Sequence, residues 1–304
     1  MRRILSHSRL TGGLALAIGI AACSSSSTGP KGPPSIPDFV FVADTGPLAQ
    51  LYLFHDSTTT LISNGTGNDT DPKSAAGMLV FSSDRDGNNE IYIADEAGVT
   101  QHRVTRGSGP NIEPALSPTG DRIAYASMAT GVPRLFIVPA PALSDTGFPT
   151  PVALPTGADT FVPEQSPVWS PDGTRVAFVS SRTGTSQVFV VAATGGTAAQ
   201  VTHETGGAFV PVWSADGQDV IYETAAGARS IARVPVASGG SSTLATDSLG
   251  IGEPTCNAEL CLAVTDPSGS DGAIVWFAFS SPTTTAILPR THNERQPAIL
   301  VAAH

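Results

Sequence analysis

One stretch of this chain occurs twice. Residues from Ser166 read SPVWSPDGTRVAFVSSR, and residues from Val210, 44 positions later, read VPVWSADGQDVIYETAA. Anchored on the shared proline, the unit recurs six times, at intervals of 42, 53, 44, 43 and 43 residues, at Pro72, Pro114, Pro167, Pro211, Pro254 and Pro297. A period in the forties with several short apolar runs per unit is typical of β-propeller blades. The sequence therefore predicts an all-β fold, a six-bladed β-propeller of four-stranded blades.

The unit that starts at Pro167 shows the predicted blade clearly. Its four strands are expected in PVWS, RVAFVSS, SQVFVVAA and AAQVTH. The second and third runs are apolar at nearly every position, as expected for a sheet that is covered on both faces by neighbouring blades. Asp172-Gly173 and Asp216-Gly217 predict two-residue hairpin turns in which both residues take positive φ angles.

The two ends of the repeat region predict how the ring closes. Pro37 is followed by DFVFVAD, a second-strand sequence with no inner strand before it, and Pro297 begins PAILVAAH, an inner-strand sequence with no partner after it. Pairing of these two segments would complete the first blade and remove two exposed edges. Residues 38–304 are thus expected to form the propeller, with Pro139–Pro151 a loop inserted between a third and a fourth strand.

The N-terminus has the features of a targeting segment. Residues 1–22 combine three arginines with a short apolar run, which is typical of a signal peptide and too short to span a bilayer. Ile20-Ala21-Ala22-Cys23 resembles the lipobox of bacterial lipoproteins, which predicts lipidation of Cys23 and, because Ser24 follows, the outer membrane. The alternative is an ordinary cleaved signal with an incidental cysteine. Residues 23–37, rich in Ser, Gly and Pro, are expected to form a tether.

The charge balance narrows the class of partner. The chain carries a formal net charge of −10, which becomes more negative once the arginines of the leader are removed. Nucleic acid is excluded as a partner because phosphate binding requires a basic surface. The electrostatic field of a negatively charged protein attracts cations or basic partners.

The last two cysteines predict a disulfide. Cys256 and Cys261 fall on the two arms of the first hairpin of their repeat, where cross-strand neighbours have the Cβ separation that a disulfide requires. An envelope location favours the oxidised form. Two free buried thiols are the alternative.

Acidic residues recur near the anchor proline. We predict that Asp71, Glu113, Glu164 and Glu253, with Arg295 beside the last of them, lie in loops that enter the inner strands and ring one mouth of the central channel. Such a ring suits a basic peptide or a divalent cation, and no other cofactor is expected. The alternative is that these are ordinary polar loop residues.

Other arrangements of reactive residues favour structural roles. Asp84, Asp86, Asn88 and Glu90 alternate, but they lack the Gly and Glu spacing of an EF-hand and indicate a hairpin turn. The repeats place histidines on or after the outer strands of different blades, and no zinc-binding H-E-x-x-H motif occurs; these are His55, His102, His203 and His292. The nucleophile motif G-x-S-x-G and the phosphate-binding P-loop are also missing from the sequence.

The repeat resembles a known family. The pattern W-S-P-D-G-x-R-[IV]-A-F-x-S, carried best by Ser166–Arg182, and the hairpin of Phe81–Asp95 are similar to the WD40-like repeats of the TolB propellers, periplasmic partners of the peptidoglycan-associated lipoprotein. The α/β domain that precedes the propeller in that family has no counterpart between the expected tether and the first blade. We therefore expect a propeller-only envelope lipoprotein, on the periplasmic face of the outer membrane or at the surface.

The resemblance implies a non-catalytic scaffold. We expect a single, monomeric propeller, anchored through the lipid on Cys23, that binds an envelope protein, peptide or glycan at a channel mouth. The alternative is a periplasmic hydrolase or lyase that acts on carbohydrate from the same mouth. A third interpretation is a component of a larger surface complex.

Overall fold

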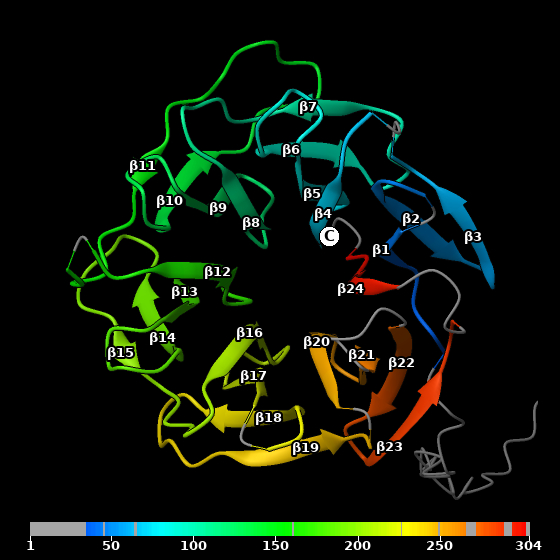
Figure 1. Cartoon of the computed structure of the whole chain (residues 1–304), viewed down its shortest axis with the longest axis vertical. Coiled ribbons are helices and arrows are strands. Elements are labelled where there is room, and N and C mark those ends of the chain that lie inside the picture. Colours follow the sequence, from blue (N-terminus) through cyan, green and yellow to red (C-terminus); the bar gives the residue numbers. More distant parts are fainter. Residues whose placement is uncertain are drawn as a thin grey trace, which may run out of the picture. The chain divides into compact units, whose positions relative to one another are not determined.

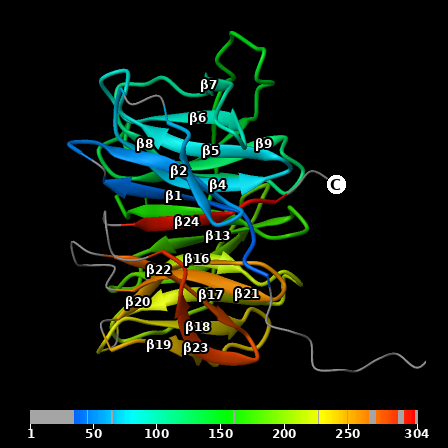
Figure 2. The same ribbon diagram turned by 90° about the vertical axis from the view of Figure 1, so that its right-hand side faces the viewer.

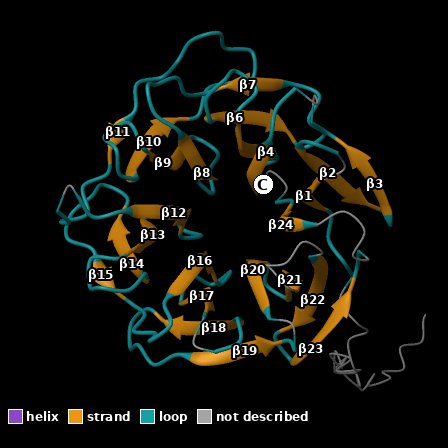
Figure 3. Cartoon of the chain, in the orientation of Figure 1, coloured by secondary structure: helices purple, strands orange, loops and turns teal. Residues whose placement is uncertain are grey.

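The computed structural model describes residues 35–44, 46–63, 66–159, 161–225, 227–248, 250–265, 272–288 and 294–301. All of them belong to the second of the two compact units of the chain, Pro34–His304. Within these ranges the regular structure is β-strand and none is helix (Figure 3). The described residues therefore include no helix long and apolar enough to cross a membrane.

The described residues form twenty-four strands in six four-stranded sheets, which are arranged in a ring (Figure 1). Adjacent strands in every sheet are antiparallel. We number the sheets as blades 1 to 6. Blade 1 contains β24 (Arg295–Ile299), β1 (Phe39–Asp44), β2 (Ala49–His55) and β3 (Thr58–Leu61). Blade 2 contains β4 (Asp69–Ala75), β5 (Met78–Ser83), β6 (Glu90–Asp95) and β7 (Gln101–Arg103).

The remaining blades follow in chain order, each from its inner to its outer strand. Blade 3 contains β8 (Asn111–Leu116), β9 (Arg122–Ser127), β10 (Arg134–Pro139) and β11 (Val152–Ala153). Blade 4 contains β12 (Glu164–Trp169), β13 (Arg175–Ser180), β14 (Gln187–Ala192) and β15 (Ala199–Gln200). Blade 5 contains β16 (Ala208–Trp213), β17 (Asp219–Thr224), β18 (Ser230–Pro235) and β19 (Ser242–Thr246). Blade 6 contains β20 (Ile251–Cys256), β21 (Leu260–Thr265), β22 (Ala273–Ala278) and β23 (Ser281–Ala286).

The predicted fold class is confirmed, including the closure of the ring. The last strand, β24, pairs with the first, β1, with Phe39 opposite Ile299 (Figure 2). The inserted loop also lies where it was predicted, between β10 and β11. Because β1 pairs with strands on both sides, its backbone groups are used in the ladder and present no open edge.

The core is divided among the interfaces between blades. Each pair of neighbouring blades encloses its own apolar cluster. Leu135 of blade 3, for example, shares a cluster with Phe178 and Phe189 of blade 4. The two central strands of a blade are therefore buried on both faces, which explains their continuous apolar runs.

The anchor proline lies at a bulge in every inner strand. In the inner strands of blades 2 to 6 the register shifts across the proline, for example between Thr70 and Lys73, and in blade 1 the shift lies opposite Val40 and Val42. Proline cannot donate a ladder hydrogen bond, so a bulge is where a strand tolerates it. The residue before the proline has a positive φ between 45° and 54° in all six blades: Asp71, Glu113, Ser166, Val210, Glu253 and Gln296.

The turn prediction was wrong in detail. Only the glycine of each Asp-Gly pair has a positive φ, 67° at Gly173 and 68° at Gly217. The backbone N–H of Gly173 donates to the carbonyl of Ser170 at 2.8 Å, so the turn spans four residues and ends in a left-handed glycine. Asp172 instead accepts hydrogen bonds from Ser170 and Thr174, which lower its pKa to about 2. Aspartate is therefore selected here as an acceptor in the turn.

The Trp and Arg of the repeat join neighbouring blades. The guanidinium of Arg175 in blade 4 lies 4.6 Å from the ring centroid of Trp213 in blade 5, and it donates to the carbonyl of Gly217. Arg122 of blade 3 stacks in the same way over Trp169 of blade 4, at 4.5 Å. The motif therefore encodes an interface between blades, which is why both residues recur at the blade period.

Candidate functional site

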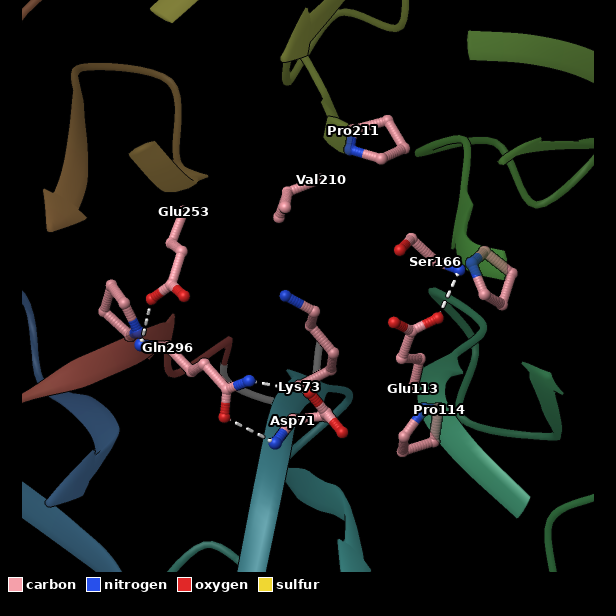
Figure 4. Close-up of a pocket in the computed structure, with 11 residues that line it drawn as sticks. Asp71, Lys73, Glu113, Pro114, Ser166, Val210, Pro211, Glu253 and Gln296 are labelled. Atoms are coloured by element: carbon pink, nitrogen blue, oxygen red, sulfur yellow. Dashed lines mark hydrogen bonds between the residues drawn. The ribbon is translucent and has the colours of Figure 1, made fainter. Parts of the chain in front are cut away.

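The six pre-proline residues line a cavity on the axis of the ring. It has a volume of about 120 Å³, and every blade contributes to its wall (Figure 4). We call this the central cavity; it is lined by Asp71, Lys73, Glu113, Pro114, Ser166, Pro167, Val210, Pro211, Glu253, Gln296 and Pro297. Its charged side chains come from blades 2, 3 and 6, whereas blades 4 and 5 contribute serine, valine and proline.

The pre-proline side chains link one blade to the next. Glu253 of blade 6 accepts a hydrogen bond from the backbone N–H of Gln296 in blade 1 at 2.7 Å. Gln296 in turn accepts from the N–H of Asp71 in blade 2 at 2.9 Å and donates its amide to the Asp71 carboxylate at 2.8 Å. Three blades are thereby joined in series around the cavity.

A second link of this kind joins blades 3 and 4, where Glu113 accepts from the N–H of Ser166 at 2.6 Å. Elsewhere another side chain takes the role: the N–H of Glu113 donates to Ser82 and that of Glu253 donates to Glu223. The acids beside the anchor proline thus satisfy backbone donors freed by the bulge, which gives them a structural role in addition to any binding role.

The charges inside the cavity are desolvated. Burial raises the pKa of Glu113, and the nearby Asp71 carboxylate adds to the rise. Burial also raises the pKa of Glu253, against the hydrogen bond from Gln296. The pKa of Lys73 is lowered by burial, although the carboxylates of Asp71, Glu253 and Glu113 act in the opposite direction. Both signs of charge are therefore held in a poorly solvated space.

Lys73 is the departure from the repeat. The position after the anchor proline is Ala115, Val168, Val212, Thr255 or Ala298 in the other five blades. In blade 2 it is a lysine, one of only two in the whole sequence. Among the described residues no hydrogen bond or ion pair is recorded for its amine, which points into the cavity (Figure 4). Sequence analysis missed this residue, and an alignment of the six repeats would have found it.

Two predicted members of the acidic ring lie elsewhere. Glu164 is fully buried and forms ion pairs with Arg182 at 2.6 Å and Arg134 at 3.3 Å. Arg295 pairs with Asp44 at 2.6 Å. Neither residue lines the central cavity. The prediction was wrong for both because they stand three and two positions before the anchor proline, where the strand directs side chains away from the axis.

The three acids that do line the cavity also differ from the prediction in one respect. Asp71, Glu113 and Glu253 lie within β4, β8 and β20 rather than in loops at a mouth. Their side chains reach the axis because the bulge turns the chain at the residue before the proline.

A second, larger recess lies further along the axis, past the ends of the inner strands. We call it the apolar funnel; it has a volume of about 450 Å³ and is lined by residues from all six blades. Its wall includes Leu116, Trp169, Trp213 and Ile299, and it shares Lys73 with the central cavity. Lys73 therefore stands between a charged cavity and an apolar one.

The predicted cysteine sites lie outside the central cavity or outside the described residues. Cys256 and Cys261 are directly opposite each other on β20 and β21 and form a disulfide with a Cα–Cα distance of 4.1 Å. Cys256 occupies the position that is tryptophan in blades 4 and 5. Cys23 and His292 lie outside the described residues.

The alternating acids and the histidines do not converge on one point. Asp84 accepts from Asn68, Asp86 binds Arg103, and Glu90 is buried against Arg103 and Thr105. His55, at the end of β2, pairs with Asp38, which raises its pKa. His102 is in β7, and His203 follows β15. Within the described ranges, no group of three or more His, Cys, Asp or Glu residues is placed to hold a metal ion.

The fold and the axial site define the class of protein as a six-bladed β-propeller. Comparison with known proteins gives the type. The family model of the TolB beta propeller domain (PD40) matches residues 151–285. The chain is therefore a TolB-like β-propeller.

Individual relatives agree with this assignment. The Tol-Pal system protein TolB of Desulfosudis oleivorans is 41% identical over 59 residues, which cover 19% of this chain and 14% of that protein. The protein TolB homolog of Chlorobium luteolum is 29% identical over 35% of this chain and 32% of its own length. The matches thus span a third or less of these relatives.

Solved structures support the fold. TolB from Acinetobacter baumannii superposes with a TM-score of 0.72 at 15% identity, covering 87% of this chain and 67% of that one. The putative TolB from Agrobacterium tumefaciens gives 0.66 at 15% identity, with 89% and 95% covered.

Proposed function

We propose that this chain is a bacterial envelope protein that binds a protein partner through its propeller without catalysing a reaction. The observation that carries the proposal is the apolar funnel on the axis of a TolB-like propeller. Concave apolar recesses with a few convergent polar groups are the usual form of binding sites. The relatives of the chain include a Tol-Pal system protein, which supports a protein-binding role in the bacterial envelope.

The chemistry of the funnel indicates the partner segment. Pro171, Ala215 and Val301 are exposed in the funnel wall and offer apolar contact area, and the chain as a whole carries a net charge of −10. A segment with apolar side chains, carried on a protein with a basic surface, fits both properties. The anionic field would steer the encounter and the apolar wall would hold the complex.

Photo-crosslinking from the funnel tests this proposal. A photoreactive amino acid at Ala215, in the funnel wall, should crosslink to one envelope protein in intact cells, expected to be a Tol-Pal component. The same amino acid at Ser242, which is exposed on the outer strand β19, is the matched control and should give no such product. Equal crosslinking from both sites would contradict binding at the funnel.

Membrane attachment is part of the same proposal. We infer that Cys23 is lipidated and that the propeller is tethered to the outer membrane. A Cys23→Ala variant should then move from the membrane fraction to the soluble periplasmic fraction, and it should lose incorporation of radiolabelled palmitate. Retention of the label at another site would contradict the assignment of Cys23.

A further inference from the structure

Lys73 brings an amine into a cavity that already holds three carboxylates, and none of the described residues forms a hydrogen bond or ion pair with it. Part of the residue is open to the channel, but its amine lies deep in the protein. Five of the six blades place a small side chain at this position, so neither the bulge nor the blade interface requires a lysine. A desolvated ammonium is costly. Asp71, Glu253 and Glu113 act on it through the cavity, but among the described residues none forms an ion pair with it, so an external anionic group would stabilise it.

The carboxylates retain free acceptor capacity on either side of this amine. Glu113 and Glu253 each use Oε2 to bind the backbone N–H of the next blade. Glu113 also accepts a hydrogen bond from the side chain of Ser166. For Oε1 of Glu253, no hydrogen bond is recorded among the described residues. Figure 4 places the two side chains on opposite sides of the Lys73 amine, with open space between them.

Ligands of a single charge fit this arrangement poorly. A simple cation would meet the Lys73 ammonium, and a simple anion would meet Glu113 and Glu253. A ligand that carries both charges satisfies both sets of groups, because each charge pairs with its opposite in a space of low dielectric.

We propose that the central cavity is a binding site for a small zwitterion, an α-amino acid, whose carboxylate contacts the amine of Lys73 and whose ammonium lies between Glu113 and Glu253. The site adjoins the apolar funnel, with which it shares Lys73, but it does not depend on the protein-binding role proposed above.

The cavity also sets the size of the ligand. A volume of about 120 Å³ has room for roughly ten water molecules at about 10–15 Å³ each. That is enough for glycine, alanine or serine, which have fewer non-hydrogen atoms than about ten water molecules. The wall opposite Lys73 consists of Ser166, Val210 and Pro211, which carry no charge. A ligand with a small, uncharged side chain therefore fits better than an acidic or basic amino acid.

Calorimetric titration of the full chain tests the charge requirement directly. L-Alanine and glycine should bind, whereas propionate, which lacks the ammonium, and ethylamine, which lacks the carboxylate, should each bind at least about tenfold more weakly, because one buried group stays unpaired. Glucose tests for general binding of polar molecules and should not bind. Equal affinity for alanine, propionate and ethylamine, or binding of glucose alone, would overturn the proposal, as would the absence of heat with either amino acid.

Charge-removing variants locate the site. Lys73→Met should weaken alanine binding at least about tenfold. Glu253→Gln and Glu113→Gln should each do so too, although glutamine can still accept the hydrogen bond from the next blade. Arg233→Met and Asp56→Asn, which remove one charge each outside the cavity, are the matched controls. A change in affinity with the controls but not with the cavity variants would refute the assignment.

Acetylation of lysine tests the same site in the protein without any substitution. With only two lysines in the sequence, acetylation of Lys73 can be followed by mass spectrometry with Lys31 as an internal reference. Bound alanine should slow the acetylation of Lys73 at least several-fold relative to Lys31, and propionate should not. An unchanged ratio at saturating alanine would place the amino acid elsewhere.

Discussion

The carboxylate of Glu253 accepts a hydrogen bond from the backbone N–H of Gln296, 43 residues further along the chain and one blade away. The two residues hold equivalent positions in their blades, each directly before an anchor proline and each with a positive φ. The acid that lines the cavity is therefore also a connector between blade 6 and the blade that closes the ring.

This double role predicts a difference between two substitutions of Glu253. Glu253→Ala leaves the Gln296 N–H without its acceptor and should lower the free energy of unfolding by about 1–2 kcal/mol. Glu253→Gln keeps an acceptor and should lower it by less than half as much. Urea unfolding followed by tryptophan fluorescence measures both. Equal losses would show that the negative charge, and not the acceptor, stabilises the link.

The pH dependence of the glutamine variant follows from the raised pKa of Glu253. Below about pH 4.5 the carboxyl is neutral in both the folded and the unfolded chain, so burial costs nothing. Above its folded pKa the carboxylate is charged in both states, and burial disfavours the fold. The free energy of unfolding of Glu253→Gln should therefore rise relative to that of the parent as the pH goes from 4 to 7. Parallel curves over this range would contradict the prediction.

Arg175 and Trp213 should be energetically coupled, because the guanidinium lies over the ring and the two side chains belong to different blades. A double-mutant cycle with Arg175→Gln and Trp213→Leu should give a coupling free energy of about 0.5–2 kcal/mol. Arg122 stacks on Trp169 rather than on Trp213, so a cycle with Arg122→Gln and Trp213→Leu is the control and should be additive within about 0.5 kcal/mol. Coupling of equal size in both cycles would mean that the blades respond as a whole.

The fold could be predicted from the sequence because its determinants are local and repeated. Each blade carries its own turn residues and apolar runs. The closure is indicated by Phe39–Asp44, which has no inner strand before it, and by Arg295–Ile299, which has no partner strand after it in the sequence. Neighbouring blades cover both faces of the central strands, so the apolar pattern alone identified them as buried.

The site was predicted only in part because the bulge breaks the alternation of the strand. In a regular strand the first and third residues before the proline would share a face. With a left-handed residue at the bulge, Glu253 faces the channel, whereas Glu164 turns into its blade and meets Arg182. Positive φ angles at Asp71 and its equivalents cannot be inferred from acidic side chains, since such residues adopt them rarely.

The disulfide between Cys256 and Cys261 should stabilise blade 6, where Cys256 stands at the position of the tryptophan in blades 4 and 5. It closes a short loop with a sequence separation of 5 residues, for which the loss of chain entropy predicts about 2 kcal/mol. The Cys256→Ala, Cys261→Ala double variant should unfold at a correspondingly lower urea concentration. Reductant should destabilise the parent by a similar amount and leave the double variant unchanged, and an effect of reductant on that variant would point to Cys23.

Lys73 should reduce the stability of the protein in the absence of a ligand. Burial lowers the pKa of its amine, so the charged form is disfavoured in the folded state. Below the folded pKa the amine is charged in both states and the full penalty applies. As the pH rises from the folded pKa towards 10.5, the ordinary pKa of a lysine, the folded chain loses its proton first and the penalty disappears. Replacement by an apolar side chain removes the penalty at every pH, as in the other five blades.

Lys73→Met should therefore raise the free energy of unfolding at pH 7 by an amount on the order of 1 kcal/mol, and this gain should shrink between pH 8 and pH 10. Arg233→Met, at a solvent-exposed ion pair, serves as the control and should change stability little at any of these pH values. Urea unfolding at several pH values measures both curves. A loss of stability in Lys73→Met at pH 7 would mean that the lysine is retained to balance Asp71, Glu113 and Glu253, and the need for an external anionic partner would fall away.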